Sequence, residues 1–172
     1  LGGNFRIDSN SGLTKIIHTQ SPQSFTNYNA SNCKITGTHN LPFGELGGDF
    51  NVSNNSGLTG LVHSASTNAF TSYKAHTCKL NSTLDLSMLT KLGGEFECYN
   101  NIGLSSITHS PTDEVFTKYW VHTCNLGGVY DVSMLNKLGG SFNVSTNPNL
   151  KNVTFPLSTE TFANTSAGND AI

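Results

Sequence analysis

The chain has 172 residues, of which 35% are hydrophobic and only 12% charged, and its net charge is −2. Its 17 glycines and its many Ser, Thr and Asn residues favour strands joined by turns over helices. There is no basic run and no apolar stretch near the roughly 20 residues of a membrane-spanning helix, so we expect no nucleic-acid partner and no membrane insertion.

The motif Leu-Gly-Gly-x-Phe occurs four times and divides the chain into repeats of 45 or 46 residues. A period of this size is typical of solenoids, propellers and linear arrays, in which each unit contacts mainly its neighbours. We therefore predict a single repeat domain over residues 1–172. Its repeats are residues 1–45, 46–91, 92–137 and an incomplete 138–172.

Each repeat divides into two halves that share one order of apolar and turn residues. In the first half Phe50-x-Val leads to Asn55, and in the second half Tyr73-x-Ala leads to Cys78. The alternation predicts a strand whose apolar side chains point inward, and the Asn or Cys marks the turn that follows. We expect the two glycines of Leu-Gly-Gly-x-Phe to form a tight corner leading into this inner strand.

This order resembles the leucine-rich repeat, whose pattern is L-x-x-L-x-L-x-x-N/C-x-L. The resemblance covers the chain from Leu1 to about Phe162. It departs from the family pattern because Phe and Tyr replace many leucines and because Leu-Gly-Gly leads directly to a Phe. The repeats are also similar to Phe-, Asn- and Thr-rich arrays in bacterial and phage surface proteins.

The resemblance implies an all-β fold: a right-handed leucine-rich-repeat-like β-solenoid with ~23-residue coils, two per repeat, and little helix. One face would carry a continuous parallel sheet, and the other would carry loops or short strands. The LDLSML stretch at Leu84, and its variant at Tyr130, resembles the extra strand that some such repeats place on the outer face.

Asn and Cys alternate at the turn after each inner strand, which is the family's ladder position. A stacked amide there can bond backbone groups of neighbouring coils. Equivalent cysteines would lie roughly 9–10 Å apart, too far for a disulfide, so we expect free, buried thiols, Cys98 included. No Cys-x-x-Cys cluster occurs, so neither a metal site nor a cofactor is expected. The ladder residues are Asn10, Asn55, Asn101, Asn147, Cys33, Cys78 and Cys124.

The histidines form two series with different expected roles. His18, His63 and His109 recur at one position, and we expect them to pack against loops with a ring edge bonded to backbone. His76 and His122 come directly after the inner strand and should point outward. The second series is therefore a candidate surface feature.

The residues between the inward positions point to the outer face of the sheet, and they vary while the interior residues repeat. The chain's only Trp lies on this face beside an outward Tyr and charges of both signs. Such an aromatic pair on a rigid sheet suits recognition of a protein or a sugar. The alternative is that these are solvent positions that vary without a ligand. The candidate ligand-binding residues are Tyr99, Trp120, His122, His76, Lys74, Lys118, Glu95 and Glu97.

No catalytic residue is assigned, because the acids are scattered and no nucleophile elbow, phosphate loop or zinc motif occurs. Seven Asn-x-Ser/Thr triplets permit a secreted, glycosylated protein, although this composition also produces them by chance. We expect a non-catalytic extracellular or cell-surface recognition module that binds a protein or glycan through the exposed sheet face. The alternative is a structural segment of a fibre, adhesin or filament, assembled head-to-tail through open solenoid ends.

Overall fold

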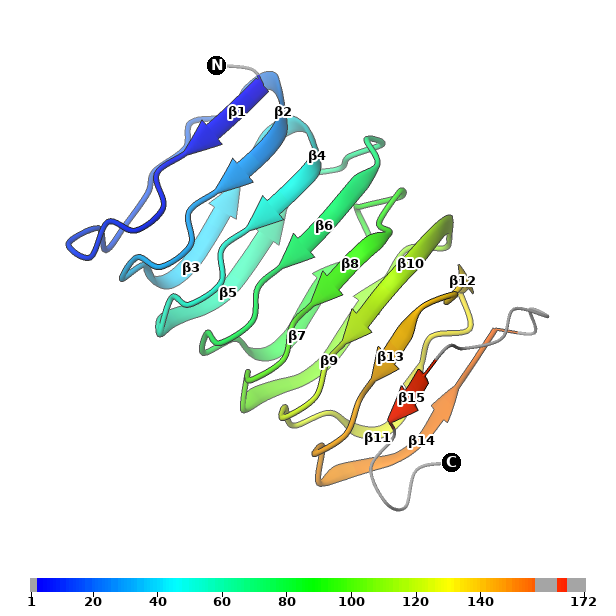
Figure 1. The fold of residues 1–172 in the computed structure, drawn as a ribbon. Coiled ribbons are helices and arrows are strands. Elements are labelled where there is room, and N and C mark those ends of the chain that lie inside the picture. Colours follow the sequence, from blue (N-terminus) through cyan, green and yellow to red (C-terminus); the bar gives the residue numbers. More distant parts are fainter. Residues whose placement is uncertain (1–2, 157–163, 167–172) are drawn as a thin grey trace.

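The chain winds into a parallel β-solenoid. The computed structural model describes residues 3–156 and 164–166, which form fifteen strands and no helix (Figure 1). Phe50 lies opposite Tyr73, and Tyr73 lies opposite Phe96, so one coil takes 23 residues. The predicted all-β solenoid with coils of this length is confirmed.

One side of the solenoid is a continuous parallel sheet, to which each coil contributes one strand (Figure 1). We call its outer surface the main-sheet face. The limits of the predicted repeat array, Leu1 and Phe162, lie outside the described residues, and no helix within those residues is long and apolar enough to cross a membrane. In spatial order the strands are β1 (Gly3–Arg6), β2 (Ser21–Asn29), β4 (Phe43–Asn51), β6 (Phe70–Lys74), β8 (Gly94–Glu97), β10 (Thr112–Trp120), β13 (Ser141–Asn143) and β15 (Asn164–Ser166), with β12 (Leu135–Lys137) beside β10.

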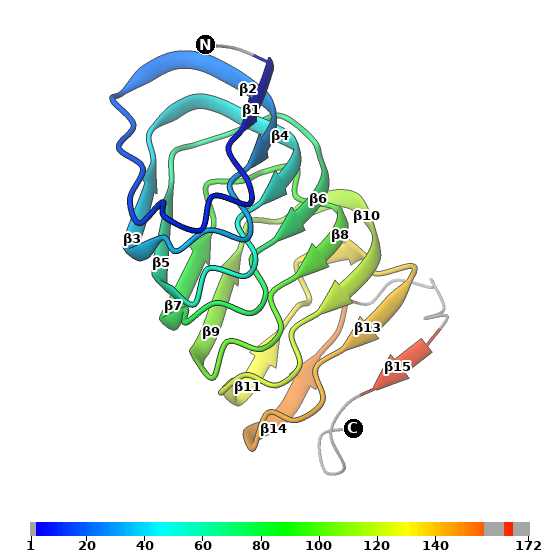
Figure 2. The ribbon, with the colours of Figure 1, turned by 60° about the vertical axis from the view of Figure 1, so that its left-hand side comes forward.

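The opposite side of the coils carries a second set of strands, which pair two by two (Figure 2). Each pair joins the second coil of one repeat to the first coil of the next, so this side is interrupted where the main sheet is continuous. The strands expected at Leu84 and Tyr130 are present here, in β7 and β11. The pairs are β3 (Thr36–Leu41) with β5 (Gly57–His63), β7 (Asn81–Leu86) with β9 (Gly103–His109), and β11 (Gly127–Asp131) with β14 (Asn149–Thr154).

A column of aromatic rings runs through the core behind the main sheet. Its members alternate between Phe and Tyr, and successive ring centroids lie between 4.7 and 5.6 Å apart. This distance is close to the spacing of neighbouring strands, about 4.8 Å, so the flat rings of successive coils can stack on one another. The column consists of Phe5, Tyr28, Phe50, Tyr73, Phe96, Tyr119 and Phe142.

The tyrosines of this column bring polar hydroxyl groups into the core, and each hydroxyl needs a partner there. Histidine Nε2 atoms provide these partners at 2.6–2.8 Å. The expectation that these rings would bond backbone was wrong, because the buried hydroxyl lies beside them and requires the bond. The pairs are His18 with Tyr28, His63 with Tyr73, and His109 with Tyr119.

The buried asparagines, which occupy alternate turns, bond backbone groups of two coils. Asn101 is fully buried; its Nδ2 donates to the carbonyl oxygens of Ala75 at 3.0 Å and Cys98 at 2.8 Å, and its Oδ1 accepts from the Leu80 N–H at 3.2 Å. Asn55 and Asn147 make the same set of bonds in their own coils. Asparagine therefore links neighbouring coils through groups that would otherwise be buried without partners.

Asn10 and the cysteines at ladder positions contribute less to the bonding between coils. Asn10 is exposed and bonds the carbonyl oxygens of Ile7 and Asp8. The cysteines at ladder positions make only weak Sγ contacts with carbonyl oxygens, at 3.4–3.5 Å. All four cysteines of the chain are free and buried, so they act mainly as small apolar residues.

In the second repeat the Leu-Gly-Gly motif lies within a strand as a bulge and does not form the expected corner, whereas in the third and fourth repeats it leads directly into β8 and β13. β4 continues through Gly48, where φ is 59° and the pairing with β6 shifts register. A Cβ atom on Gly48 would lie 1.7 Å from the carbonyl oxygen of Thr26, and one on Gly94 would lie 2.0 Å from that of Thr71. Glycine is required because the backbone of the preceding coil passes too close for any side chain.

Replacing Asn101 by Ala should destabilise the protein far more than replacing Cys124 by Ala. The first change leaves an N–H and two carbonyl groups buried without partners, at a cost of about 3 kcal/mol or more. The second removes a small apolar side chain and should cost about 1 kcal/mol. Urea denaturation followed by circular dichroism measures both, and equal losses would contradict the ladder role of the asparagine.

Buried neutral histidines should make stability depend on pH. Burial lowers the pKa of His109 to about 3 and that of His39 to about 4, whereas histidine in an unfolded chain has a pKa near 6.5. As the pH falls below 6.5 the unfolded chain binds protons and the folded chain does not. The free energy of unfolding is therefore highest above pH 6.5 and decreases toward pH 3.

We expect the free energy of unfolding to be lower by about 2 kcal/mol or more at pH 4.5 than at pH 7.5, as measured by urea denaturation. His109→Gln introduces an amide that can bond the hydroxyl of Tyr119 in place of the imidazole and removes one titrating group. This variant should show a smaller difference between the two pH values. A difference as large as in the wild type would exclude His109 as a source of the pH dependence.

Candidate binding face

Two rows of side chains point outward from the main sheet, two residues apart along each strand. Parallel pairing places successive members of a row one strand spacing apart, about 4.8 Å. The first row is Asn4, Asn27, Asp49, Ser72, Glu95, Lys118 and Ser141. The second row is Arg6, Asn29, Asn51, Lys74, Glu97, Trp120 and Asn143.

All eight candidate ligand-binding residues lie together on three neighbouring strands of this face. We call them the aromatic–charged cluster. They are Lys74 and His76 from β6 and its turn, Glu95, Glu97 and Tyr99 from β8 and its turn, and Lys118, Trp120 and His122 from β10 and its turn.

The four charged side chains of the cluster neutralise one another. Lys74 Nζ lies 2.6 Å from a Glu95 carboxylate oxygen and 3.2 Å from one of Glu97. Lys118 Nζ lies 3.3 Å from an oxygen of each glutamate. The Glu97 side chain is only 8% exposed, although it belongs to an outward row. The network therefore offers a ligand little free charge, and it holds three strands in fixed positions.

The network keeps two of its groups charged over a wide pH range. Hydrogen bonding and charge from Lys74 lower the pKa of Glu95, an effect that burial partly opposes. Burial by itself lowers the pKa of Lys74, but hydrogen bonds to Glu95 and Glu97 more than compensate, so the pKa of Lys74 is raised. Neither Glu95 nor Lys74 is thereby suited to exchange protons near neutral pH.

Tyr99 is stacked between two histidines at the turns. Its ring centroid lies 4.4 Å from that of His76 and 4.7 Å from that of His122, and the rings are within 3° and 8° of parallel. Burial lowers the pKa of both histidines and raises the pKa of Tyr99. The stack is thus uncharged near neutral pH, and both faces of Tyr99 are covered, which leaves its edge for a ligand.

Trp120 is held from two sides and remains half-buried. Its Nε1 donates to Ser141 Oγ at 2.8 Å, and Lys118 Nζ lies 4.7 Å from the ring centroid. The ring meets Tyr99 at 61°, with the centroids 6.2 Å apart. Trp120 is therefore an aromatic surface with little freedom left to lose on binding.

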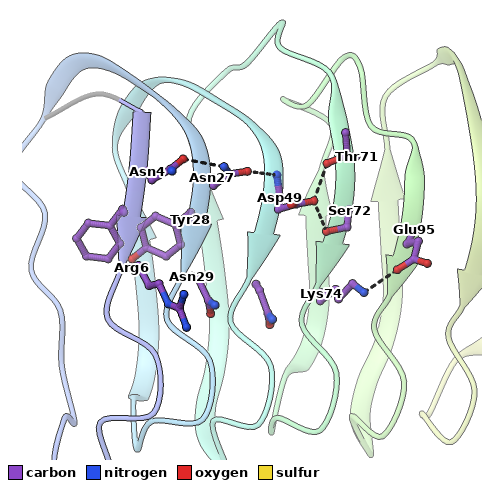
Figure 3. Close-up of a pocket in the computed structure, with 12 residues that line it drawn as sticks. Asn4, Arg6, Asn27, Tyr28, Asn29, Asp49, Thr71, Ser72, Lys74 and Glu95 are labelled. Carbon is purple, nitrogen blue, oxygen red and sulfur yellow. Dashed lines mark hydrogen bonds and ion pairs between the residues drawn. The ribbon is translucent and has the colours of Figure 1, made fainter.

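Sequence reasoning missed a groove over the N-terminal half of the main-sheet face (Figure 3). The groove has a volume of about 670 Å³. Short polar side chains occupy both outward rows here, between the longer Arg6 and Lys74, and this pattern was a usable signal. We call this the polar groove. Its lining residues are Asn4, Phe5, Arg6, Asn27, Tyr28, Asn29, Asp49, Asn51, Thr71, Ser72, Lys74 and Glu95.

Hydrogen bonds link the floor of the polar groove across four strands (Figure 3). Asn27 Nδ2 donates to Asn4 Oδ1 at 2.7 Å, and Asn27 Oδ1 accepts from the Asp49 N–H at 3.1 Å. Asp49 Oδ1 accepts from Thr71 Oγ1 at 2.6 Å and from Ser72 Oγ at 2.9 Å. These bonds fix the orientation of the floor before any ligand arrives.

The described residues contain no group of three or more His, Cys, Asp or Glu side chains placed to hold a metal ion. No family model, no curated protein and no solved structure matches the chain. Fold and surface geometry therefore define the class of protein: a parallel β-solenoid with one continuous sheet face, on which an aromatic–charged cluster adjoins a polar groove.

Proposed function

We propose that this protein is a non-catalytic recognition module of the extracellular space or a cell surface, which binds a protein or a glycan on its main-sheet face. The observation that carries the proposal is the aromatic–charged cluster. Eight side chains that vary between coils meet on one continuous sheet, and their own contacts hold them in place.

Fixed side chains favour binding because little conformational entropy remains to be lost. Trp120 is restrained by Ser141 and Lys118, and Tyr99 by two histidines. Aromatic side chains of this kind supply most of the binding free energy at many recognition surfaces. The neighbouring ion pairs exclude water from the edge of such a contact without contributing much affinity themselves.

The proposed class is a leucine-rich-repeat-like solenoid of the Phe-, Asn- and Thr-rich kind found on bacterial and phage surfaces. The coil length of 23 residues and the asparagine bonds at the turns support this resemblance. Repeat proteins of this shape present long, rigid faces to their ligands.

A non-catalytic role is supported by how the ionisable groups of the cluster are occupied. Glu95 and Glu97 are both paired with lysines, and His76 and His122 are both stacked on Tyr99. A general acid or base needs a group free to exchange a proton with the substrate. Among the described residues, the cluster offers no such unpaired carboxylate.

The alternative is a structural segment of a fibre, adhesin or filament, in which coils of successive copies stack. The outer edge of β1 favours it: within the described residues β1 pairs only with β2, and Phe5 and Ile7 are only partly buried. An added coil, from either the same chain or a second copy, would extend the sheet and the aromatic column there.

Trp120→Ala should lower binding at least tenfold, about 1.4 kcal/mol, with little change in melting temperature because the side chain is half-buried. Suitable probes are a printed oligosaccharide array and a random-peptide phage library. Val129→Ala, at an exposed position on the opposite side of the coils, is the control and should leave binding unchanged. Absence of binding to both probes, or loss of the fold in Trp120→Ala, would contradict the proposal.

The structural alternative predicts that the protein associates end to end. Sedimentation velocity at rising concentration should then show growing particles, and electron micrographs should show filaments. Phe5→Asp should abolish both, because a charge would be buried in the aromatic column. A species that stays monomeric at every concentration would exclude assembly from this chain alone.

A further inference from the structure

We propose that the polar groove binds an uncharged linear polysaccharide, laid across the strands parallel to the solenoid axis. This inference rests on the proposed recognition function and names the class of ligand for one part of the main-sheet face. The free polar groups of the groove, their spacing and the pairing of the charges around them suit such a ligand.

Two asparagine side chains in the groove offer free hydrogen-bond donors. Asn29 Oδ1 accepts from the N–H and the hydroxyl of Ser31, at 3.1 and 2.8 Å, and Asn51 Oδ1 accepts from the same groups of Ser53, at 3.0 and 2.7 Å. These bonds fix both amide planes. Neither Nδ2 group has a hydrogen-bond partner among the described residues, so two oriented donors remain for a ligand.

Asp49 offers a free hydrogen-bond acceptor beside these donors. Asp49 Oδ1 accepts hydrogen bonds from the hydroxyls of both Thr71 and Ser72, and its Oδ2 has no partner among the described residues. A sugar hydroxyl both donates and accepts a hydrogen bond. It can therefore donate to Asp49 while a neighbouring hydroxyl accepts from Asn51, which lies two residues along the same strand.

The spacing of the strands under the groove matches that of the sugars in an extended chain. From Arg6 to Lys74 the second row crosses three strand spacings, about 14 Å at about 4.8 Å each. One strand spacing is close to the length of a pyranose ring, so successive sugars of an extended chain meet equivalent positions on successive strands. A repeating ligand matches a repeating surface, and no rearrangement of the groove is needed.

The cations at the two ends of the groove are paired with carboxylates. Arg6 Nε lies 2.6 Å from Asp8, and Lys74 Nζ lies 2.6 Å from Glu95, so both cations at the ends of the groove are already paired. The free oxygen of Asp49 would repel a carboxylate or a sulfate. The surroundings therefore select an uncharged sugar over an acidic one.

The lining of the groove favours a glycan over a protein as the ligand. Protein partners are usually anchored by a large side chain inserted into an apolar pocket. The only aromatic residues that line the groove are Phe5 and Tyr28, and Tyr28 is fully buried. A lining of amides, hydroxyls and one carboxylate offers instead many hydrogen bonds and no apolar anchor, which is the complement of a sugar chain.

Isothermal titration calorimetry with four hexasaccharides tests the proposal: cellohexaose, mannohexaose and fully N-acetylated chitohexaose are uncharged, and hexagalacturonate is acidic. At least one uncharged probe should bind, and hexagalacturonate should bind at least tenfold more weakly. Asn51→Ala should lower the affinity for the uncharged probe at least tenfold. Asp49→Asn, which keeps the acceptor for Thr71 and Ser72, should lower it as well.

Asn143→Ala is the matched control. Asn143 occupies the same row on β13, outside the groove, and its Oδ1 accepts from the N–H and hydroxyl of Ser145 at 3.0 and 2.7 Å, as Asn51 does with Ser53. Both variants lose the same local bonds, so their melting temperatures should fall equally. Only Asn51→Ala should lose sugar binding; Asn143→Ala should bind within twofold of the wild type.

Three results would overturn the proposal: no uncharged hexasaccharide binds, hexagalacturonate binds as tightly, or the two asparagine variants weaken binding equally. Failure of the groove is distinguishable from failure of the recognition function. Peptide binding that is lost in Trp120→Ala and retained in Asn51→Ala, together with no binding of any uncharged hexasaccharide, would leave the main-sheet face a recognition surface for proteins and would exclude the sugar groove.

Discussion

The distance between neighbouring parallel strands, about 4.8 Å, is the constraint on which the rest of this protein depends. In a solenoid every interior side chain faces its own equivalent at that distance. Planar rings fit that distance, and the core accordingly contains a column of stacked Phe and Tyr rings. Asparagine amides recur in every second coil, in alternation with cysteine, and bond the backbone of the preceding coil. The buried tyrosine hydroxyls in turn require the histidines, and the buried turn backbone requires the asparagines.

The same spacing organises the outer surface, with a different result in its two halves. Over β8 and β10 the outward side chains are long, and they fill the surface with ion pairs and stacked rings. Over β2 and β4 they are short and leave the polar groove. One scaffold thus supports an aromatic surface beside a hydrogen-bonding surface, because the interior that positions both recurs from repeat to repeat.

Much of this arrangement could be predicted from the sequence, because the strict alternation around Phe50, Tyr73 and Phe96 sets coil length, strand position and facing. The neighbourhood of Tyr99 and Trp120 followed from that register. Contacts set by the third dimension could not be predicted. The bond of His109 to Tyr119 joins two sides of the coil, the bulge at Gly48 depends on the backbone of the previous coil, and the groove is a property of side-chain length over several strands.

The bonds between histidine and tyrosine have a consequence for how such a molecule can change length. Each bond joins the first coil of a repeat to its second, as His63 does with Tyr73, while the short strand pairs such as β7 with β9 join one repeat to the next. Losing a single coil would leave a tyrosine hydroxyl without its histidine. Loss or duplication of a whole 45- or 46-residue repeat preserves each of these pairs, so the unit of growth is the pair of coils.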